Sequence, residues 1–310
     1  MNIVVLGAGA VGGYFGGRLA SSGSAVTFLV RERRYQQLKN TRLNVQSTHG
    51  NFSVTPRLSL STQEIDNPDV VLVAIKNYHL KDAFPQIKKL VQKGAKVLPL
   101  LNGVQHMETL ISEFGQESVL GGLCYIETTL DENGKIVHTS PMHDIVFGSL
   151  TSFTDEPFLK DLEVAFKNSG VNIRRSQSIM VEMWQKFIFL TSFSGITAAT
   201  RKPIGDILND AVSHDFLQDM IQEIISVAEA KQVKLPSSTF EQVINKLKSV
   251  TPTMTSSLHR DLEKGLPLEI DSLQGAVLEM AKSCAINVPC IRSVYALLHP
   301  YQEGAHKYQE

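Results

Sequence analysis

The sequence predicts an α/β domain with a parallel sheet, followed by an all-α domain, and three observations support this order. Short apolar runs alternate with helical stretches through the first half of the chain, as in parallel strands joined by crossover helices. From about Ser178 onward, helical periodicity replaces the strands. The length of 310 residues suits two domains of ordinary size. We place the boundary near Ser176, which gives domains 1–176 and 177–310.

The first strand and the first helix are joined by a glycine motif. An apolar run, Ile3–Leu6, precedes Gly7-Ala8-Gly9-Ala10-Val11-Gly12, and a helical stretch follows. Gly7 permits a tight turn, Gly9 lets the backbone approach a pyrophosphate, and Gly12 allows close packing of helix on strand. Unpaired N–H groups at the helix start would favour the anion. The motif predicts a Rossmann-type dinucleotide-binding domain; a glycine-rich turn without a ligand is the alternative.

The end of the second strand discriminates between cofactors. NAD-specific sites usually carry an acidic residue about 20 residues beyond the glycines. In this chain the strand Ala25–Val30 ends at Arg31, and Arg34 adds positive charge nearby. A guanidinium can hold a 2′-phosphate in a way that a carboxylate cannot. Arg31 therefore favours NADP(H) over NAD(H).

The remaining elements of the first domain follow from short apolar runs bounded by turns. Pro99 is unsuited to a central strand, because it lacks a ladder donor. The turn at Glu132–Gly134 precedes two short strands that we expect to be antiparallel to each other. The predicted strands are Val70–Ile75, Lys96–Leu101, Val119–Tyr125, Lys135–His138, Ile145–Phe147 and Val171–Ile173, with a helix over Pro157–Asn168.

The second domain is predicted from apolar residues at helical spacing. Ile179, Met183, Phe187 and Leu190 mark one face of its first helix. Five further helices are expected at Ser213–Gln232, Thr239–Lys248, Ser256–Lys264, Asp271–Ser283 and Ile291–Leu298.

Composition restricts the class of partner. The chain has 43% hydrophobic residues, a net charge of -1 and no long block of like charge, so we expect neither nucleic-acid nor membrane binding. Three irregularly spaced cysteines fit a reducing cytosol better than a disulfide framework or a metal site. No signal peptide or membrane-spanning run is recognisable. We expect a soluble cytoplasmic protein that acts on a small molecule, and a homodimer remains open.

Polar residues at the carboxyl ends of the parallel strands are candidates for ligand binding. The glycine turn, Lys76–Tyr78 and Leu101–Val104 each follow a predicted strand, and such ends line one crevice in open parallel sheets. Lys76 and Asn102 could contact ribose or nicotinamide, although strands often end in polar residues.

The second domain offers two further candidates. Lys186 lies among Trp184, Phe187 and Ile188, where lost hydration would ease proton release; a lysine that snorkels from the core edge is the alternative. Glu269 lies just before Asp271, which is expected to cap a helix.

Together these segments resemble the ketopantoate reductase family, and the resemblance spans nearly the full chain. The matching landmarks are the glycine motif, Arg31, Ile75-Lys76, Leu101-Asn102-Gly103, Glu182-Met183-Trp184-Gln185-Lys186, Ser256-Ser257, Arg260-Asp261 and Glu269-Ile270-Asp271. The resemblance implies NADPH-dependent reduction of 2-dehydropantoate to (R)-pantoate, a step toward pantothenate and coenzyme A. It implies that Lys186 is the general acid and lies beside Glu269 in an interdomain cleft. It further implies that Asn102 positions nicotinamide and substrate, and that Ser257 binds the substrate carboxylate.

Three positions depart from the family pattern. Leu190, Ser194 and Met254 stand where the resemblance leads us to expect asparagines. Each lost amide removes a hydrogen bond worth about 0.5–1.5 kcal/mol. Leu190 and Ser194 are expected on the substrate side, and Arg201 or Lys202 could attract a carboxylate. A small 2-oxo acid is the predicted substrate, ketopantoate first. A reductase of another branched 2-oxo acid and a non-catalytic NADPH sensor are the alternatives.

Overall fold

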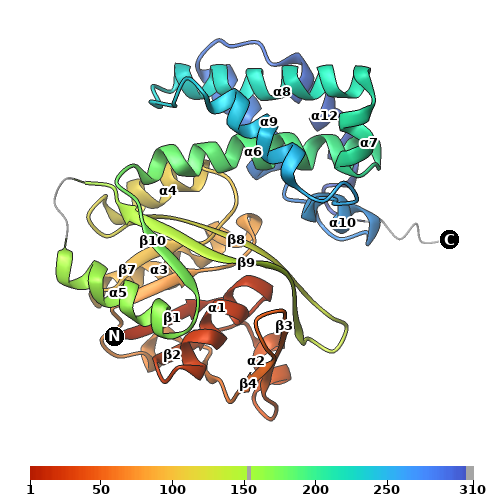
Figure 1. Ribbon diagram of the computed structural model, residues 1–310. Coiled ribbons are helices and arrows are strands. Elements are labelled where there is room, and N and C mark those ends of the chain that lie inside the picture. Colours follow the sequence, from red (N-terminus) through yellow and green to blue (C-terminus); the bar gives the residue numbers. More distant parts are fainter. Residues whose placement is uncertain (152–154, 305–310) are drawn as a thin grey trace. The chain divides into compact units, whose positions relative to one another are not determined.

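The computed structural model describes residues 1–151 and 155–304, and the chain forms two compact units. The first comprises Met1–Leu101 and His106–Ile179, and the second comprises Asn102–Gln105 and the chain from Met180 onward. Among the described residues every strand lies in the first unit, and the second is helical (Figure 1). The predicted order of an α/β domain followed by an all-α domain is confirmed. Within the described ranges, no helix is both long and apolar enough to cross a membrane.

The first sheet has five parallel strands in the order β5-β2-β1-β6-β7. β1 is central, and its Ile3, Val4 and Val5 are at most 1% exposed, as expected for a strand covered on both faces. Pro99 ends β7, the last strand in this order, so its missing N–H interrupts no central ladder. The strands are β1 (Asn2–Leu6), β2 (Ala25–Leu29), β5 (Arg57–Ser59), β6 (Val70–Val73) and β7 (Lys96–Pro99).

Helix α1 (Ala10–Ser21) packs between this sheet and a second sheet, and glycines make room for it. A Cβ atom at Gly16 would lie 2.6 Å from Phe28 of the first sheet. A Cβ atom at Gly17 would lie 3.0 Å from Leu43 of the second. Glycines one turn earlier, at positions 12 and 13, face the two sheets in the same way. The glycines therefore let both sheets approach one helix closely, which fixes where the motif before α1 lies.

The second sheet corrects one prediction. Lys135–His138 and Ile145–Phe147 are wrong as two antiparallel strands, because both belong to the single strand β9. The antiparallel partner of β9 is β8. The register shifts between His138 and His143, where Pro141 lies in a bulge that needs no ladder donor from it. The strands run β10-β9-β3-β4, with β8 beside β9: β3 (Leu43–Ser47), β4 (Phe52–Val54), β8 (Leu120–Leu130), β9 (Ile136–Ser149) and β10 (Asn172–Arg175).

The other helices of the first unit surround these sheets. The predicted helix at 157–168 and strand at 171–173 are confirmed as α5 and β10, each shifted by one or two residues. The short strands β3, β4 and β5 were not predicted, because three to five residues of mixed polarity carry little periodic signal. The helices are α2 (Glu32–Leu38), α3 (Leu80–Gln92), α4 (Gln105–Phe114) and α5 (Glu156–Asn168), with 3₁₀ turns η1 (Thr62–Glu64) and η2 (Asn77–His79).

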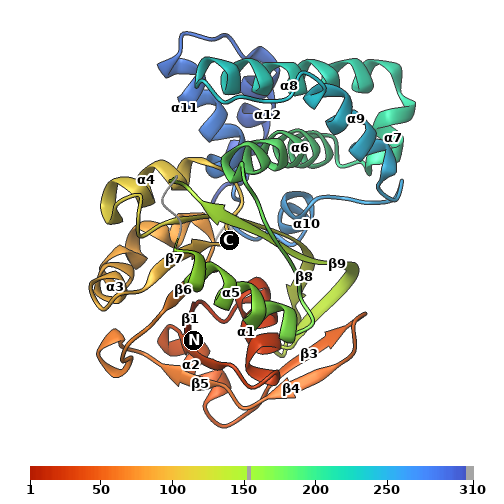
Figure 2. The same cartoon turned by 60° about the vertical axis from the view of Figure 1, so that its left-hand side comes forward.

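The second unit is built on the long helix α6, whose residues 191–198 are all buried. Helices α8, α9 and α12 lie on one side of α6 in both ribbon views (Figures 1 and 2). Most predicted helices are confirmed, but the segment expected as one helix at 271–283 begins with a π-helical turn, η3, and α7 was not predicted. The elements are α6 (Ile179–Thr200), α7 (Ile204–Asn209), α8 (Ala211–Ala230), α9 (Thr239–Ser249), α10 (Ser257–Glu263), η3 (Asp271–Gly275), α11 (Ala276–Ser283), α12 (Pro289–Leu298) and η4 (His299–Tyr301).

Candidate functional site

The glycine motif of the first unit has the shape that a dinucleotide needs. Gly7 has φ +97°, and a Cβ atom there would lie 2.7 Å from the Ile75 side chain, so the turn requires glycine. A Cβ atom at Gly12 would collide with the Gly7 carbonyl oxygen. At Gly9, by contrast, nothing lies within 4 Å of the added atom. The backbone is therefore closely packed on the strand side and open at Gly9, which fits the approach of a pyrophosphate.

The start of α1 is also suited to an anion. Gly9 is its N-cap and offers no side-chain hydrogen bond to the first turn, which contains Ala10 and Val11. Such a helix start presents backbone N–H groups and a positive dipole end. Lys76 follows β6, and β6 pairs with β1, so the glycine turn and Lys76 follow neighbouring strands. A dinucleotide would take its phosphate contacts from the helix start.

Arg34 holds this loop in place. Its Nε donates to the carbonyl oxygen of Ala8 at 2.9 Å, and both terminal nitrogens lie 3.2 Å from the carbonyl oxygen of Gly134. Burial lowers the pKa of Arg34. Sequence reasoning treated Arg34 only as added positive charge for the cofactor. In the structure it joins the glycine loop to the turn between β8 and β9.

Arg31 is placed differently, at the N-cap of α2 with its side chain 63% exposed. Its Nη2 lies 3.6 Å from Oδ2 of Asp82, and its Nη1 lies 3.4 Å from Nδ1 of His79. Burial and the charge of Arg31 lower the pKa of His79, and Asp82 opposes them. Arg31 is therefore accessible to a phosphate, but Asp82 competes for its guanidinium.

In the second unit, Lys186 and Asn102 are in direct contact. Lys186 lies on α6, and its Nζ donates to Oδ1 of Asn102 at 3.1 Å. Gly103 has φ +90°, and a Cβ atom there would lie 2.6 Å from the carbonyl oxygen of Ser272. Gln105 donates to the carboxylate of Glu279 on α11. The loop after β7 is therefore held by the helical unit, which places an amide oxygen on the lysine.

The segment that contains Glu269 approaches the same loop. The hydroxyl of Ser272, whose backbone Gly103 touches, donates to the carbonyl oxygen of Glu269 at 3.0 Å. Glu269 lies between Leu268 and Ile270, which are 3% and 0% exposed and anchor it. The π-helical turn η3 follows, a geometry common at functional sites. A direct pairing of Glu269 with Lys186 stays a prediction.

Asp271 corrects a smaller expectation. It does not cap the following helix with its side chain. Its carboxylate accepts hydrogen bonds from the hydroxyl of Tyr295 at 2.8 Å and from Nε2 of Gln302 at 2.5 Å. Asp271 therefore ties the segment after Glu269 to the end of the chain, a long-range contact that no local pattern predicts.

The other predicted substrate residues fall in different environments. Leu190 is half-buried, one helical turn after Lys186. Ser194 is fully buried, and its hydroxyl donates to the carbonyl oxygen of Thr191 at 3.4 Å. Ser257 is exposed at the first turn of α10, and Ser256 caps that helix by accepting from the backbone N–H of His259. Their roles toward a substrate stay predictions.

Arg201 is engaged within its own unit. Its guanidinium donates to the carbonyl oxygens of Ala198 and Ala199 and lies 5.5 Å from the ring centroid of Tyr301. Sequence reasoning missed the contact between Lys246 on α9 and Phe189 on α6, in which Nζ lies 4.9 Å from the ring centroid. A lysine in the last turn of a surface helix is common, so no sequence signal distinguished Lys246.

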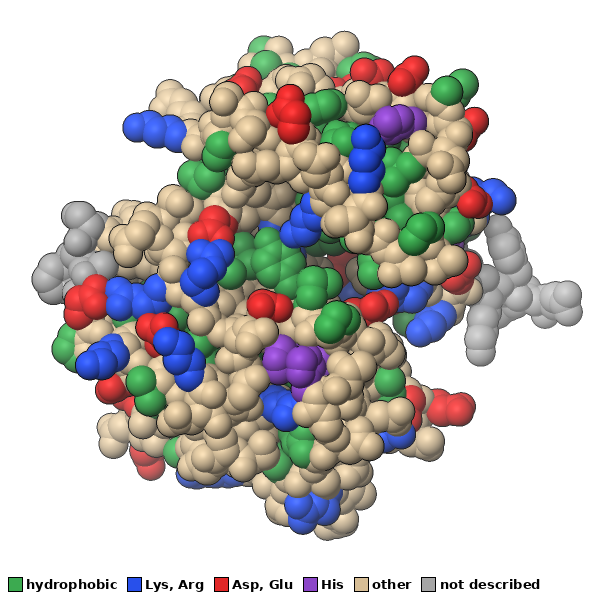
Figure 3. Space-filling model, viewed as in Figure 1, with side chains coloured by type: hydrophobic (Ala, Val, Ile, Leu, Met, Phe, Trp, Pro, Cys, Tyr) green, Lys and Arg blue, Asp and Glu red, His purple; other side chains and the backbone are tan. Residues whose placement is uncertain are grey.

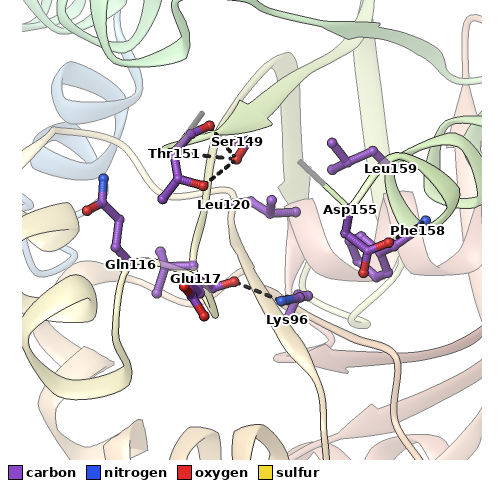
Figure 4. Close-up of a pocket in the computed structure, with 10 residues that line it drawn as sticks. Lys96, Gln116, Glu117, Leu120, Ser149, Thr151, Asp155, Phe158 and Leu159 are labelled. Atoms are coloured by element: carbon purple, nitrogen blue, oxygen red, sulfur yellow. Dashed lines mark hydrogen bonds between the residues drawn. The ribbon is translucent and has the colours of Figure 1, made fainter. Parts of the chain in front are cut away.

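A small cavity in the first unit lies apart from the glycine motif (Figure 4). It has a volume of about 70 Å³ and is lined by residues that include Lys96, Glu117 and Asp155. Lys96 donates to the carbonyl oxygen of Glu117 there. Pockets for ligands of drug size are roughly 300–1,000 Å³. The cavity is therefore too small for a dinucleotide, and it holds none of the predicted site residues.

Known proteins resemble the chain over nearly its whole length. The family descriptions "Ketopantoate reductase PanE/ApbA" and "Ketopantoate reductase PanE/ApbA C terminal" match residues 3–152 and 178–302. The uncharacterized oxidoreductase YkpB of Bacillus subtilis (strain 168) is 38% identical over 302 residues, which are 97% of this chain and 99% of that protein.

Two solved structures share the fold. A PanE/ApbA family ketopantoate reductase from Ralstonia eutropha JMP134 has a TM-score of 0.87 at 28% identity, covering 97% of this chain and 98% of that one. D-mandelate dehydrogenase, in a ternary structure with NADH and anilino(oxo)acetate, has the same TM-score and the same coverage at 22% identity, a likeness of fold alone. The chain therefore belongs to the ketopantoate reductase family and is an oxidoreductase with a Rossmann-type domain.

Proposed function

We propose that this oxidoreductase is an NADPH-dependent 2-dehydropantoate 2-reductase, which reduces ketopantoate to (R)-pantoate for pantothenate and coenzyme A synthesis. The observation that carries the proposal is the Lys186 ammonium, hydrogen-bonded to Oδ1 of Asn102 at 3.1 Å. In a chain of this family, a positioned ammonium in the helical unit is the group expected to act on a substrate carbonyl.

The chemistry assigned to Lys186 follows from charge. Reduction of the C2 carbonyl converts a neutral oxygen into one with alkoxide character, which a nearby ammonium stabilises and protonates. When bound, the nicotinamide supplies the hydride. Asn102 accepts a hydrogen bond from Lys186 and so directs one N–H away from the carbonyl. In this proposal, another N–H group of the same ammonium donates to the substrate oxygen.

The neighbouring residues orient the two reactants in this proposal. Glu269 would hold the ammonium or bind the substrate hydroxyl, and Ser257 would bind the carboxylate. Gly7-Ala8-Gly9-Ala10-Val11-Gly12, Lys76 and Asn102 would contact the cofactor. Arg31 would pair with the 2′-phosphate, which is why NADPH is proposed over NADH.

Turnover of a panel of 2-oxo acids with each cofactor tests this function. The wild type should prefer ketopantoate with NADPH, and Lys186→Met should lower kcat by about 100-fold or more, the typical loss of a general acid. Lys248→Met, an exposed lysine in the last turn of α9, is the control. Unchanged turnover in Lys186→Met would reject the catalytic role, and absence of turnover in the wild type would favour a sensor.

A second substrate class has a specific observation in its favour. Leu190 offers a hydrocarbon surface one turn after Lys186, and the hydroxyl of Ser194 is engaged inside the helix. An apolar surface favours a branched or larger side chain on the 2-oxo acid. A higher kcat/KM for such an acid than for ketopantoate would identify that acid as the preferred substrate. The proposed role of Lys186 would stand.

A further inference from the structure

A buried amide, that of Gln274, ties the π-helical turn η3 to helix α6. The Gln274 side chain is 0% exposed, and its Nε2 donates to the carbonyl oxygen of Thr191 on α6 at 2.9 Å. The same nitrogen lies 3.5 Å from the hydroxyl oxygen of Ser194. Gly195 makes room for the amide, because a Cβ atom there would lie 2.8 Å from Nε2. The amide therefore lies directly on the backbone of the helix that carries Lys186.

The burial of Gln274 is costly for stability. Its Oε1 is buried without a hydrogen-bond partner among the residues that the structure describes, and so is the hydroxyl oxygen of Thr191. Burial of an amide oxygen or a hydroxyl without a partner disfavours folding. An apolar side chain of similar volume would fill the same space without that cost. Stability alone therefore does not explain a glutamine at this position.

The turn that Gln274 anchors is wider than an α-helical turn. The N–H of Gly275 donates to the carbonyl oxygen of Ile270, five residues earlier, at 2.9 Å, whereas an α-helix spans four residues. Leu273 of the same turn is buried as well, but apolar contacts have no preferred direction. The hydrogen bond from Gln274 is directional and fixes where the turn lies along α6.

The same turn touches the loop that carries Asn102. A Cβ atom at Gly103 would lie 2.6 Å from the carbonyl oxygen of Ser272, so the backbones of the loop and the turn are in contact. Residues 102–105 belong to the second unit, as do η3 and α6. A displacement of η3 along α6 would therefore move Asn102 relative to Lys186.

We propose that Gln274 is a positioning residue for catalysis, which acts on Lys186 through η3 and Asn102. The proposal rests on the proposed reduction of a 2-oxo acid, in which the Lys186 ammonium protonates the substrate oxygen. The hydrogen bond from Nζ to Oδ1 of Asn102, 3.1 Å long, requires that α6 and the loop keep fixed places. Gln274 holds η3, and with it the loop, in register with α6, so its contribution falls on the orientation of the ammonium rather than on folding.

Replacement of Gln274 by leucine separates position from stability. Gln274→Leu removes the amide and keeps a side chain of similar volume. We expect kcat to fall by about 10-fold or more, because a misplaced catalytic group loses rate, while KM and the midpoint of thermal unfolding stay at the wild-type value or improve. Gln222→Leu, at an exposed position of α8, is the control and should leave kcat unchanged. A wild-type kcat in Gln274→Leu overturns the proposal.

A double-mutant cycle tests whether Gln274 acts through Asn102. If both residues act through one hydrogen bond, Gln274→Leu should cost little further rate in a protein that already carries Asn102→Ala. A glutamine with a merely structural role would lower kcat by the same factor in both backgrounds. Equal factors would therefore reject the route through Asn102.

The reactivity of the Lys186 amine gives a measurement that needs no substrate. A hydrogen bond to the charged ammonium favours the charged form, so loss of the Asn102 contact should leave more of the neutral amine that acetic anhydride acetylates. Gln274→Leu should raise the acetylation rate of Lys186 by about 3- to 10-fold. Lys248, an exposed lysine of α9, is the internal standard in peptide mass spectrometry. An unchanged relative rate contradicts the proposal.

The labelling and the kinetics separate this inference from the proposed function. If the wild type reduces no 2-oxo acid and Gln274→Leu still raises the labelling of Lys186, the reaction is wrong and the positioning of Lys186 by Gln274 stands. If the wild type reduces the acids and Gln274→Leu changes neither kcat nor labelling, the reaction stands and the positioning role is wrong. Should Gln274→Leu fail to fold, Gln274→Met, which also removes the amide, takes its place in each measurement.

Discussion

The Nζ of Lys186 donates to Oδ1 of Asn102 at 3.1 Å, although 84 residues separate them along the chain. Asn102 begins the loop that follows the last strand of the parallel sheet, yet residues 102–105 pack with the helices. The helical unit thus carries both the lysine and the amide that orients it.

Loss of that amide should slow the reaction without unfolding the protein. We expect Asn102→Ala to lower kcat by about 10- to 100-fold, because a hydrogen bond to a charged group is worth about 1.5–3 kcal/mol. Steady-state rates measure the effect, and thermal unfolding checks the fold. Asn209→Ala, at the exposed end of α7, serves as the control. A wild-type kcat in Asn102→Ala would show that the hydrogen bond does not position the ammonium.

Removal of the Asp82 carboxylate, which competes with a phosphate for Arg31, should strengthen NADPH binding. Arg31 and Asp82 form an exposed ion pair with 3.6 Å between Nη2 and Oδ2, and such pairs are worth about 0.2–1 kcal/mol. Asp82→Asn should therefore lower the Kd for NADPH by about two- to fivefold and leave that for NADH unchanged, while Arg31→Gln should raise the NADPH value selectively.

Calorimetric titration of both cofactors measures these Kd values. Asp66→Asn removes an exposed carboxylate elsewhere in the first unit and controls for net charge. Equal changes for the two cofactors would argue against a 2′-phosphate role for Arg31.

The carboxylate of Glu223 should contribute to stability. From α8 it accepts hydrogen bonds from the backbone N–H groups of Cys290 and Ile291 at 2.8 and 2.9 Å, and so caps the start of α12. Glu223→Ala should destabilise the protein by about 1–3 kcal/mol, because buried helix donors lose charged partners. Urea unfolding measures the change, and Glu229→Ala, exposed on the same helix, should have little effect.

Glu223→Ala should also make the thiol of Cys290 more reactive. Burial raises the pKa of Cys290 to about 12, with the charge and hydrogen bond of Glu223 as further causes. Without that carboxylate the pKa should fall, and more of the reactive thiolate should form. Faster labelling of Cys290 by a disulfide reagent in Glu223→Ala is the expected result, and an unchanged rate would contradict this account.

A histidine cluster in the first unit should make stability depend on pH. Histidine side chains gather on the face shown in Figure 3. His143 is 3% exposed, stacks on His49 with centroids 3.7 Å apart and is hydrogen-bonded to Tyr14. Burial, followed by the charges of His49, Arg18 and His138, lowers the pKa of His143 from 6.5 to about 4.

The direction in which stability changes with pH follows from proton binding. Between the unfolded pKa of 6.5 and the folded value of about 4, the unfolded chain binds a proton at His143 and the folded chain does not. Stability should therefore fall as the pH decreases through this range, at up to about 1.4 kcal/mol per pH unit for one group. Urea midpoints between pH 7 and 4 measure the slope. His143→Phe should flatten the slope of stability against pH, whereas His299→Asn should leave it unchanged. Equal slopes in the wild type and both variants would refute the assignment of the slope to His143.

The candidate site shows which features can be predicted from local sequence patterns. The glycine motif and Arg31 stand out because each depends on residue type at a short fixed spacing, whereas Lys186 was singled out as the general acid by the family resemblance. The single strand β9 was predicted as two, and only its pairing with β8 shows that one strand with a register shift spans both segments. Lys246 carried no signal, because its neighbour Phe189 is distant in sequence.

By itself, the sequence determined that an α/β unit with a dinucleotide-type glycine motif precedes a helical one and which residue types are available for chemistry, because local periodicity and turn chemistry are short-range properties. Only the tertiary structure decided that Asn102 meets Lys186, that Arg34 supports the glycine loop and that Lys246 lies over the ring of Phe189. Those contacts arise when helices and sheets bury their apolar faces, and the burial brings together side chains that no local pattern relates.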